Sequence, residues 1–328
     1  MRLVRKNALQ DALRPVAELG GNVTIRYSPL VKDALDHGFP VVALETGIIT
    51  HALPHPMNLE TALAVEEQLK AAKVVPATIG VIDGDAVIGL TPEELTRLAK
   101  DPDAVRVSIR DLPIIETRGS TGGVTLAAAV HLAHRADIKV CATTGLGGVH
   151  RAHTVGTALQ ESSDLTALAI HPLVLITAGV RPMLDVPATL ERLETLSVPV
   201  LGYRSDEFAG FYIASSGFAV DHRVDNAAEI AAIARARDEL GLTQTLLISN
   251  PIRRDREVPD YDERLAQAVE IASRYMADGE DDTQILLASL EEATGGIAWQ
   301  VNREIYRQNV ALAAEVAKEL ASTPRYTD

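Results

Sequence analysis

One stretch of this 328-residue sequence gathers groups that bind anions. An apolar run that begins at Ile138 leads into a glycine turn and then into two hydrogen-bond donors: Gly145, Gly147, Gly148, His150 and Arg151. Glycine lets backbone N–H groups come close to a phosphate or carboxylate, and the histidine and arginine can donate further hydrogen bonds. A tight turn between a strand and a helix needs the same glycines, so the pattern leaves an anion site and a structural bend both open.

Glu45 and Arg181 are candidates for chemistry because each follows an apolar strand. Glu45 interrupts the apolar run 39–50, where a buried carboxylate is costly unless it is paired or acts as an acid or base. A structural ion pair would explain Glu45 almost equally well. Arg181 stands between a strand at 172–177 and a helix at 187–196, which is where active groups lie in open parallel sheets.

Polar side chains in two other segments could face the same ligand. Arg106 and Ser108 share one face of the strand 105–109, where Arg106 could bind an anion or pair with a carboxylate. Ser162 and Asp164 precede a helix, so they serve as caps or contact a ligand.

A second glycine-rich turn, 119–125, is expected to open a helix at 126–136. It carries the hydroxyls of Ser120, Thr121 and Thr125. Since a helix start offers free N–H groups and the positive end of the helix dipole, this turn is the better phosphate-site candidate of the two. Near the end of the chain, Asn302 and Asn309 are seven residues apart and share one face of a long helix.

Two histidines, His51 and His55, have a spacing that suggests a metal clip. Pro54 and Pro56 prevent the helix that would put both imidazoles on one face, so we expect no zinc site there. Residues 204–224 hold four of the twelve aromatic residues, together with serines and glycines, and are expected to form a lid or an edge region.

Strand and helix patterns alternate along most of the chain without a linker or a repeat, which predicts one α/β domain with mostly parallel strands. We place this domain at 29–322, between an N-terminal extension 1–28 and a tail 323–328. The composition is consistent with one large domain, because a chain with 47% hydrophobic and 23% charged residues can form a large buried core. The pattern also predicts a helix capped by Asn58, a hairpin at Asp83-Gly84 and a capping box at Thr91.

The net charge and the cysteine content limit the partners and the cellular compartment that we expect for this protein. A net charge of −14 and a pI near 5.1 argue against nucleic-acid or anionic-membrane partners. The one cysteine, Cys141, lies in an apolar run, and no run has the length of a membrane span or the form of a signal peptide. We therefore expect a cytoplasmic protein that acts on a small molecule.

Seven motifs together resemble the pseudouridine-5′-phosphate glycosidase family, in order and over residues 28 to 322. They are Val42-Ala-Leu-Glu-Thr46, Pro76-Ala-Thr-Ile79, Ser108-Ile-Arg-Asp-Leu112, Thr144-Gly-Leu-Gly-Gly-Val-His-Arg151, Ala178-Gly-Val-Arg-Pro-Met-Leu-Asp185, Val198-Pro-Val-Leu-Gly-Tyr203 and Ser249-Asn-Pro251. The resemblance implies a homotrimer with a three-layer α/β/α fold and a mostly parallel central sheet. It also implies reversible cleavage of the C–C bond between uracil and ribose 5-phosphate, aided by a divalent metal, typically Mn²⁺.

Three functional positions of the family differ in this sequence. The family's general acid or base matches Glu45, but its Schiff-base lysine aligns with Arg181, its second lysine with Arg106, and its metal-binding aspartate with Gln160. A guanidinium stays protonated and cannot form an imine, whereas a desolvated lysine can. Gln160 offers only a neutral oxygen, so metal binding is expected to be weaker or absent.

The resemblance leaves a phosphosugar-binding frame in place. Its expected members are Ser108, Thr125, Thr144, Gly145, Gly147, Gly148, His150, Arg151, Ser162, Asp164 and Asn302. We therefore expect a phosphorylated ribosyl ligand and an enzyme, a lyase or hydrolase, that makes or breaks a C–C or C–N bond at C1′ without a lysine imine. A C-glycosyl synthase of a C-nucleoside pathway and a non-catalytic phosphosugar-binding paralogue remain alternatives, as does transfer of the nucleophile to Lys73 or Lys139.

Overall fold

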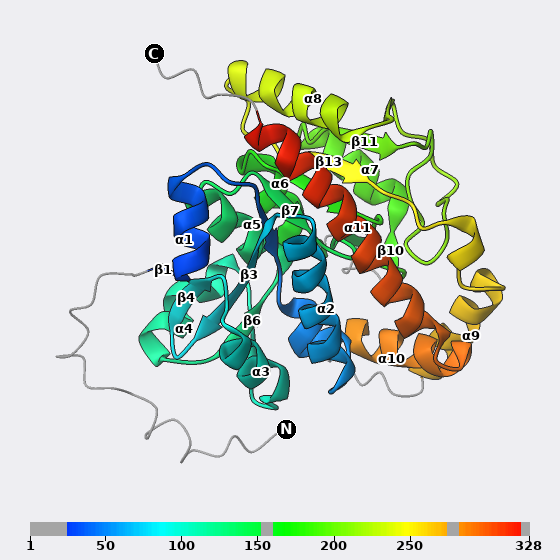
Figure 1. Ribbon diagram of the computed structural model, residues 1–328. Coiled ribbons are helices and arrows are strands. Elements are labelled where there is room, and N and C mark those ends of the chain that lie inside the picture. Colours follow the sequence, from blue (N-terminus) through cyan, green and yellow to red (C-terminus); the bar gives the residue numbers. More distant parts are fainter. Residues whose placement is uncertain (1–24, 152–159, 274–281, 323–328) are drawn as a thin grey trace.

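One large sheet runs through the computed structural model, which describes residues 25–151, 160–273 and 282–322 (Figure 1). Its strands are β1 (Arg26–Tyr27), β2 (Val41–Leu44), β3 (Val75–Ile82), β4 (Asp85–Ile88), β5 (Val105–Val107), β6 (Gly122–Val124), β7 (Val140–Ala142), β9 (Val174–Thr177), β11 (Val200–Tyr203), β12 (His222–Val224) and β13 (Leu246–Ser249). The main order is β1-β4-β3-β2-β7-β9-β13-β11-β12, and β6 pairs with β3 and β5. Every pairing in this sheet is parallel except those of β3 with β4 and β6. β8 (Val149–His150) and β10 (Leu184–Asp185) form a small second sheet.

Helices cover both faces of the large sheet. They are α1 (Pro29–Asp36), α2 (Met57–Ala71), α3 (Pro92–Lys100), α4 (Leu112–Arg118), α5 (Leu126–Arg135), α6 (Ser163–Ile170), α7 (Val186–Thr195), α8 (Ala227–Glu239), α9 (Tyr261–Ser273), α10 (Asp282–Thr294) and α11 (Ile297–Ala321). One core cluster joins α1, α5, α6 and α7 to the sheet, and another joins α2, α3, α8 and α11 to the opposite face (Figure 1). The expected three-layer α/β/α fold is therefore confirmed.

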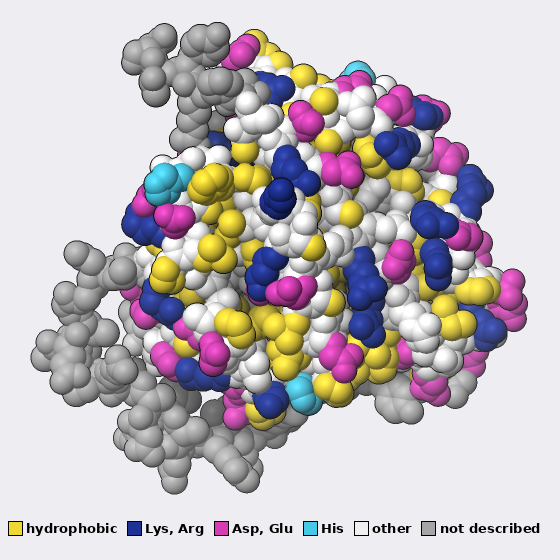
Figure 2. Space-filling view, in the orientation of Figure 1, with side chains coloured by type: hydrophobic (Ala, Val, Ile, Leu, Met, Phe, Trp, Pro, Cys, Tyr) yellow, Lys and Arg dark blue, Asp and Glu magenta, His cyan; other side chains and the backbone are white. Residues whose placement is uncertain are grey.

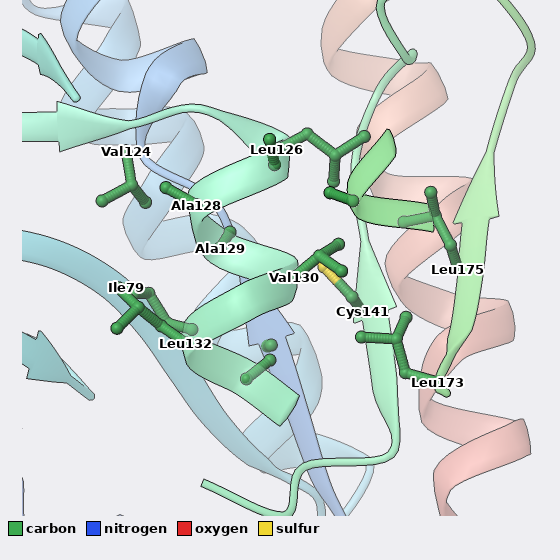
Figure 3. Close-up of a cluster of buried hydrophobic side chains, with 14 of the residues drawn as sticks. Ile79, Val124, Leu126, Ala128, Ala129, Val130, Leu132, Cys141, Leu173 and Leu175 are labelled. Carbon is green, nitrogen blue, oxygen red and sulfur yellow. The ribbon is translucent and has the colours of Figure 1, made fainter. Parts of the chain in front are cut away.

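The central strands carry apolar side chains on both faces because helices cover both faces of the sheet. In β2, Ala43 packs into the cluster with α5, while its neighbours Val42 and Leu44 pack into the cluster with α2 and α11. Figure 3 shows how the alanine-rich helix α5 lies on the sheet, with Val130 beside Cys141. The thiol is thus a core group, and burial raises its pKa.

Several local predictions are confirmed. Thr91 and Glu94 cap α3 reciprocally, and Asp83 and Gly84, both with positive φ, join β3 to β4. Asn58 was expected as a helix cap, which is wrong. Its amide lies inside the first turn of α2 and donates hydrogen bonds to the carbonyl oxygens of Ile49 and Ala99.

Four segments differ from expectation in whole or in part. The turn 119–125 contains strand β6, so Ser120 and Thr121 lie at the opposite end of that strand from α5. The glycine turn after β7 leads to strand β8 and not to a helix. Residues 204–224 form an edge region, one of the two expected alternatives, because they end in the edge strand β12, and their aromatic side chains Phe208, Phe211 and Tyr212 are buried. The sheet itself starts within the stretch 1–28 expected as an extension, since β1 pairs with β4.

The surface carries both signs of charge. Figure 2 shows Lys and Arg side chains interspersed with Asp and Glu on one face of the molecule. Within the described residues, no helix combines the length and the apolarity needed to cross a bilayer.

Candidate active site

A small pocket, with a cavity volume of about 50 Å³, lies at the carboxyl ends of β2, β7 and β9. It is lined by Glu45, Gly47, Ile48, His51, Ala52, Arg106, Thr125, Leu126, Thr144, Asp164, Arg181, Phe211, Leu287 and Asn302. Parallel strands end at the same edge of a sheet, so Glu45, Thr144 and Arg181 come together although they are far apart in the sequence. Helices and short strands supply the rest: Arg106 from β5, Asp164 from α6 and Asn302 from α11.

The Glu45 carboxyl group is buried just beyond the end of β2, with 1% of the residue exposed. Its Oε2 accepts a hydrogen bond from the Gly47 N–H at 2.9 Å, and its Oε1 accepts one from the Thr143 hydroxyl at 3.0 Å. Burial raises the pKa of Glu45 above its ordinary value, and the nearby charge of Arg181 is the strongest influence against the rise. A carboxyl group whose pKa is raised by burial and lowered by a neighbouring positive charge is suited to proton transfer.

Asp164 connects the two glycine-rich segments. Its Oδ1 accepts a hydrogen bond from the Ala127 N–H at 2.9 Å, and its Oδ2 accepts one from the Gly147 N–H at 2.8 Å. The hydroxyl of Thr125 accepts a further bond from the Ala128 N–H. These N–H groups at the start of α5 already have partners in the protein, so the expectation that they are free to bind a phosphate is wrong.

Arg181 lies close to Glu45 without a hydrogen-bonded partner for its guanidinium among the described residues. Its backbone N–H donates to the carbonyl of Leu146, which fixes the loop after β9 against the glycine turn. Six of the seven lysines fall in the described part of the chain, and all six are exposed and absent from the pocket lining: Lys32, Lys70, Lys73, Lys100, Lys139 and Lys318.

Asn302 presents an unsatisfied acceptor to the pocket. The residue is 4% exposed, and its Oδ1 makes no hydrogen bond to any residue that the structure describes. A buried amide oxygen without a donor is unfavourable by about 1–3 kcal/mol, so this atom favours a ligand that carries a hydroxyl or N–H group. Asn309, about two turns further along α11, has a structural role instead, because its amide donates a hydrogen bond to the Thr143 carbonyl at 2.7 Å.

Other predicted site residues lie outside the pocket lining: Ser108, Gly145, Gly147, Gly148, His150, Arg151, Gln160 and Ser162. Several have clear packing roles. A side chain at Gly147 would collide with Ser162, and one at Gly148 would collide with Thr189. Ser162 caps α6 by accepting from the Asp164 N–H, and the Arg151 guanidinium donates to the Leu184 carbonyl at 3.5 Å. Their part in ligand binding stays a prediction.

Sequence reasoning missed the apolar lining, namely Ile48, Ala52, Leu126, Phe211 and Leu287, and it considered His51 only as a metal ligand. The signal for His51 was its position six residues after Glu45, in the turn that follows β2. Phe211 and Leu287 come from segments whose place in the fold no local pattern reveals.

The described residues around Gln160 do not fit the divalent metal that the resemblance implies. Gln160 is exposed and offers a neutral amide oxygen, whereas Mn²⁺ and Mg²⁺ sites favour carboxylates. Among the described residues, no three His, Cys, Asp or Glu side chains are grouped to hold a metal ion. We assign no step of the reaction to a metal.

Residues 30–319 match the family model described as indigoidine synthase A like protein. The chain belongs to this family. It is 50% identical over 293 residues to a pseudouridine-5′-phosphate glycosidase of Saccharopolyspora erythraea, covering 89% of this chain and 96% of that protein. It is 42% identical over 309 residues to a protein of the same name from Frankia alni, covering 94% and 85% of the two chains.

Two solved structures share the fold. An indigoidine synthase A-like protein from Thermotoga maritima has a TM-score of 0.82 and 33% identity, covering 91% of this chain and 97% of that one. The prealnumycin C-glycosynthase AlnA, solved in complex with ribulose 5-phosphate, has a TM-score of 0.83 and 30% identity, covering 92% and 98%. The expected resemblance to pseudouridine-5′-phosphate glycosidases is therefore confirmed.

Proposed function

We propose that this protein makes or breaks a glycosidic bond at C1′ of a ribose 5-phosphate moiety without a lysine imine. The observation that carries the proposal is the pocket itself, in which the acid Glu45 lies near the guanidinium of Arg181 and no described lysine takes part. The relatives named pseudouridine-5′-phosphate glycosidase support the substrate class.

In the direction of cleavage, Glu45 acts as the general acid. Its raised pKa favours the protonated form, which donates its proton to the aglycone atom bonded to C1′ as the electron pair of that bond moves to the aglycone. Arg181 then stabilises the carboxylate that remains. Water attacks C1′, Glu45 takes a proton from it, and ribose 5-phosphate is released. The C–C or C–N identity of the bond depends on the aglycone.

The polar side of the pocket suits the phosphosugar. Asn302 Oδ1 can accept a hydrogen bond from a ribose hydroxyl, and Thr125 and Thr144 add hydroxyl groups. Arg106 and Arg181 supply positive charge, and a guanidinium binds phosphate oxygens in a bidentate manner.

A synthetic direction is the second candidate, because the chain shares its fold and 30% identity with a C-glycosynthase solved with ribulose 5-phosphate. Proton transfer then runs in reverse: Glu45 donates a proton to the C1′ hydroxyl, which leaves as water, and then accepts the proton released by the acceptor carbon as that carbon bonds to C1′. A non-catalytic phosphosugar-binding protein is the third outcome that an experiment must separate.

The test incubates the purified protein with pseudouridine 5′-phosphate, and separately with ribose 5-phosphate and uracil, and identifies products by mass spectrometry. We expect turnover that Glu45→Gln lowers by roughly 10²–10⁴-fold, the range for loss of a general acid. Binding of ribose 5-phosphate without any turnover would support the non-catalytic alternative. Absence of both would refute the proposal.

The variant Arg181→Lys and a borohydride trap address the imine directly. Wild-type protein should give no covalent ribose adduct after reduction, because a guanidinium does not form an imine. Arg181→Lys should acquire or increase cleavage of pseudouridine 5′-phosphate and should trap an adduct at position 181. An adduct on a lysine of the wild-type protein would contradict the non-imine route.

A further inference from the structure

The pocket lining includes apolar residues that a phosphosugar does not need. Ile48, Leu126, Phe211 and Leu287 line the pocket together with the polar groups. A ribose 5-phosphate is covered with hydroxyl and phosphate oxygens, which gain nothing from apolar neighbours. The apolar surface therefore fits the other half of the substrate, the aglycone.

Phe211 is held in an unusual backbone conformation. Its φ is +66°, in the left-handed region that residues other than glycine, asparagine and aspartate rarely adopt. The surrounding structure maintains it, since its N–H donates to the Ala178 carbonyl at 2.9 Å and its ring packs edge-on against Tyr212 at 4.7 Å between centroids. Residues kept in such conformations cluster at ligand sites.

Glycines on the two neighbouring loops make room for the segment that carries Phe211. A side chain at Gly145 would collide with the edge of the Phe211 ring, and a side chain at Gly179 would collide with the carbonyl of Ala209. Gly145 belongs to the loop after β7 and Gly179 to the loop after β9. The Phe211 ring is thus packed closely against the backbone at Gly145.

The same loops carry the reacting groups. Gly145 follows two residues after Thr143, whose hydroxyl donates to Glu45. Ala178, which accepts from the Phe211 N–H, stands three residues before Arg181. The ring is therefore fixed relative to the atoms that would transfer the proton at C1′.

We infer that Phe211 is the specificity-determining contact for the aglycone, selecting a planar aromatic or heteroaromatic ring over a puckered one. The inference rests on the proposed function. Contacts between an aromatic side chain and a base are worth roughly 5- to 150-fold in affinity, the equivalent of about 1–3 kcal/mol, and they depend on a flat ligand surface. Ribose 5-phosphate lacks the aglycone, so its binding should be independent of the ring.

The first experiment is calorimetry on wild-type protein and Phe211→Leu, with pseudouridine 5′-phosphate and ribose 5-phosphate as probes. Phe211→Leu should weaken the nucleotide roughly 5- to 150-fold and change ribose 5-phosphate affinity less than about twofold. Phe218→Leu, in the same segment but 39% exposed and outside the pocket, is the matched control and should change neither. Unchanged nucleotide affinity in Phe211→Leu, or equal losses for both probes, overturns the inference.

A second measurement needs no variant and covers the case in which Phe211→Leu fails to fold. Wild-type protein is titrated with uridine 5′-phosphate and with 5,6-dihydrouridine 5′-phosphate, whose saturated base is puckered. We expect the planar base to bind at least about fivefold more tightly. Equal affinities overturn the inference alone. Failure of the wild-type protein to bind ribose 5-phosphate or any of the nucleotides refutes the proposed function instead.

Discussion

Replacing Asp164 by asparagine tests whether one carboxylate holds the two glycine-rich segments together. The side chain is 5% exposed and accepts hydrogen bonds from the N–H groups of Ala127 and Gly147, at 2.9 and 2.8 Å. Asparagine has a single acceptor oxygen, and its NH₂ group would face the second N–H. One buried backbone donor would then have no acceptor, and the negative charge near the start of α5 would be lost.

The expected loss of stability follows from these two changes. An unsatisfied buried donor is destabilising by about 1–3 kcal/mol, and the charge at a helix start contributes about 0.3–1 kcal/mol, up to about 2 in partly buried geometry. We expect Asp164→Asn to lower the free energy of unfolding by about 2–4 kcal/mol. For a large domain this corresponds to a fall in Tm of roughly 4–12 °C.

Thermal unfolding followed by far-UV circular dichroism, at one protein concentration, measures the effect. The matched control is Glu161→Gln, three residues earlier, where the carboxylate forms a partly exposed ion pair with Arg192 at 2.8 Å. Such pairs contribute at most about 1 kcal/mol. If Asp164→Asn is no more destabilising than Glu161→Gln, the bridging role assigned to Asp164 is wrong.

Three further predictions concern pH, packing and assembly. The pKa of His171 is lowered to about 4, chiefly by burial and then by the neighbouring charges of His131 and His134. The unfolded chain therefore binds a proton at this side chain below about pH 6.5, whereas the folded chain binds it only below about pH 4. Stability should therefore fall as the pH drops through this window, by at most about 3 kcal/mol, and His171→Gln should flatten the dependence of Tm on pH; an unchanged slope would count against it. Gly148→Ala should lower unfolding free energy by about 1–3 kcal/mol, because the new methyl group collides with Thr189, and urea titration would measure it. A wild-type level of stability would show that the loop adapts. The resemblance leads us to propose a homotrimer, so sedimentation equilibrium should give three times the 35.1 kDa chain mass, and a monomer would contradict it.

The sequence was sufficient to predict the edge of the sheet where the candidate site lies. Apolar strands that end in Glu45, in the glycine turn and near Arg181 bring those residues together once the strands are parallel, and parallel strands follow from alternating strand and helix patterns. It could not be predicted in the same way that the Ala127 N–H at the start of α5 already has a hydrogen-bond acceptor in the protein. The carboxylate that accepts from the Ala127 N–H belongs to Asp164, and only the tertiary fold places α6 against α5.

The role of the glycines could not be read locally either. A glycine that lets a ligand approach and a glycine that makes room for a neighbouring side chain look alike in a sequence. At Gly147 and Gly148 the neighbours are Ser162 and Thr189, which lie many residues away. The burial of Phe211 escaped prediction because its segment has few regular elements and its core cluster includes residues that follow β9 and β13 and residues of α9, α10 and α11.

The span of the pocket along the chain has a consequence for biosynthesis. Its lining begins at Glu45 and ends at Asn302, on the last helix. A chain emerging from the ribosome therefore carries the acid and the guanidinium before it has a closed site, since Leu287 and Asn302 are synthesised long after Arg181. Truncation before α11 would remove the helix that carries the unsatisfied Asn302 oxygen, so ligand recognition should arise only after α11 has been synthesised and has packed against the sheet.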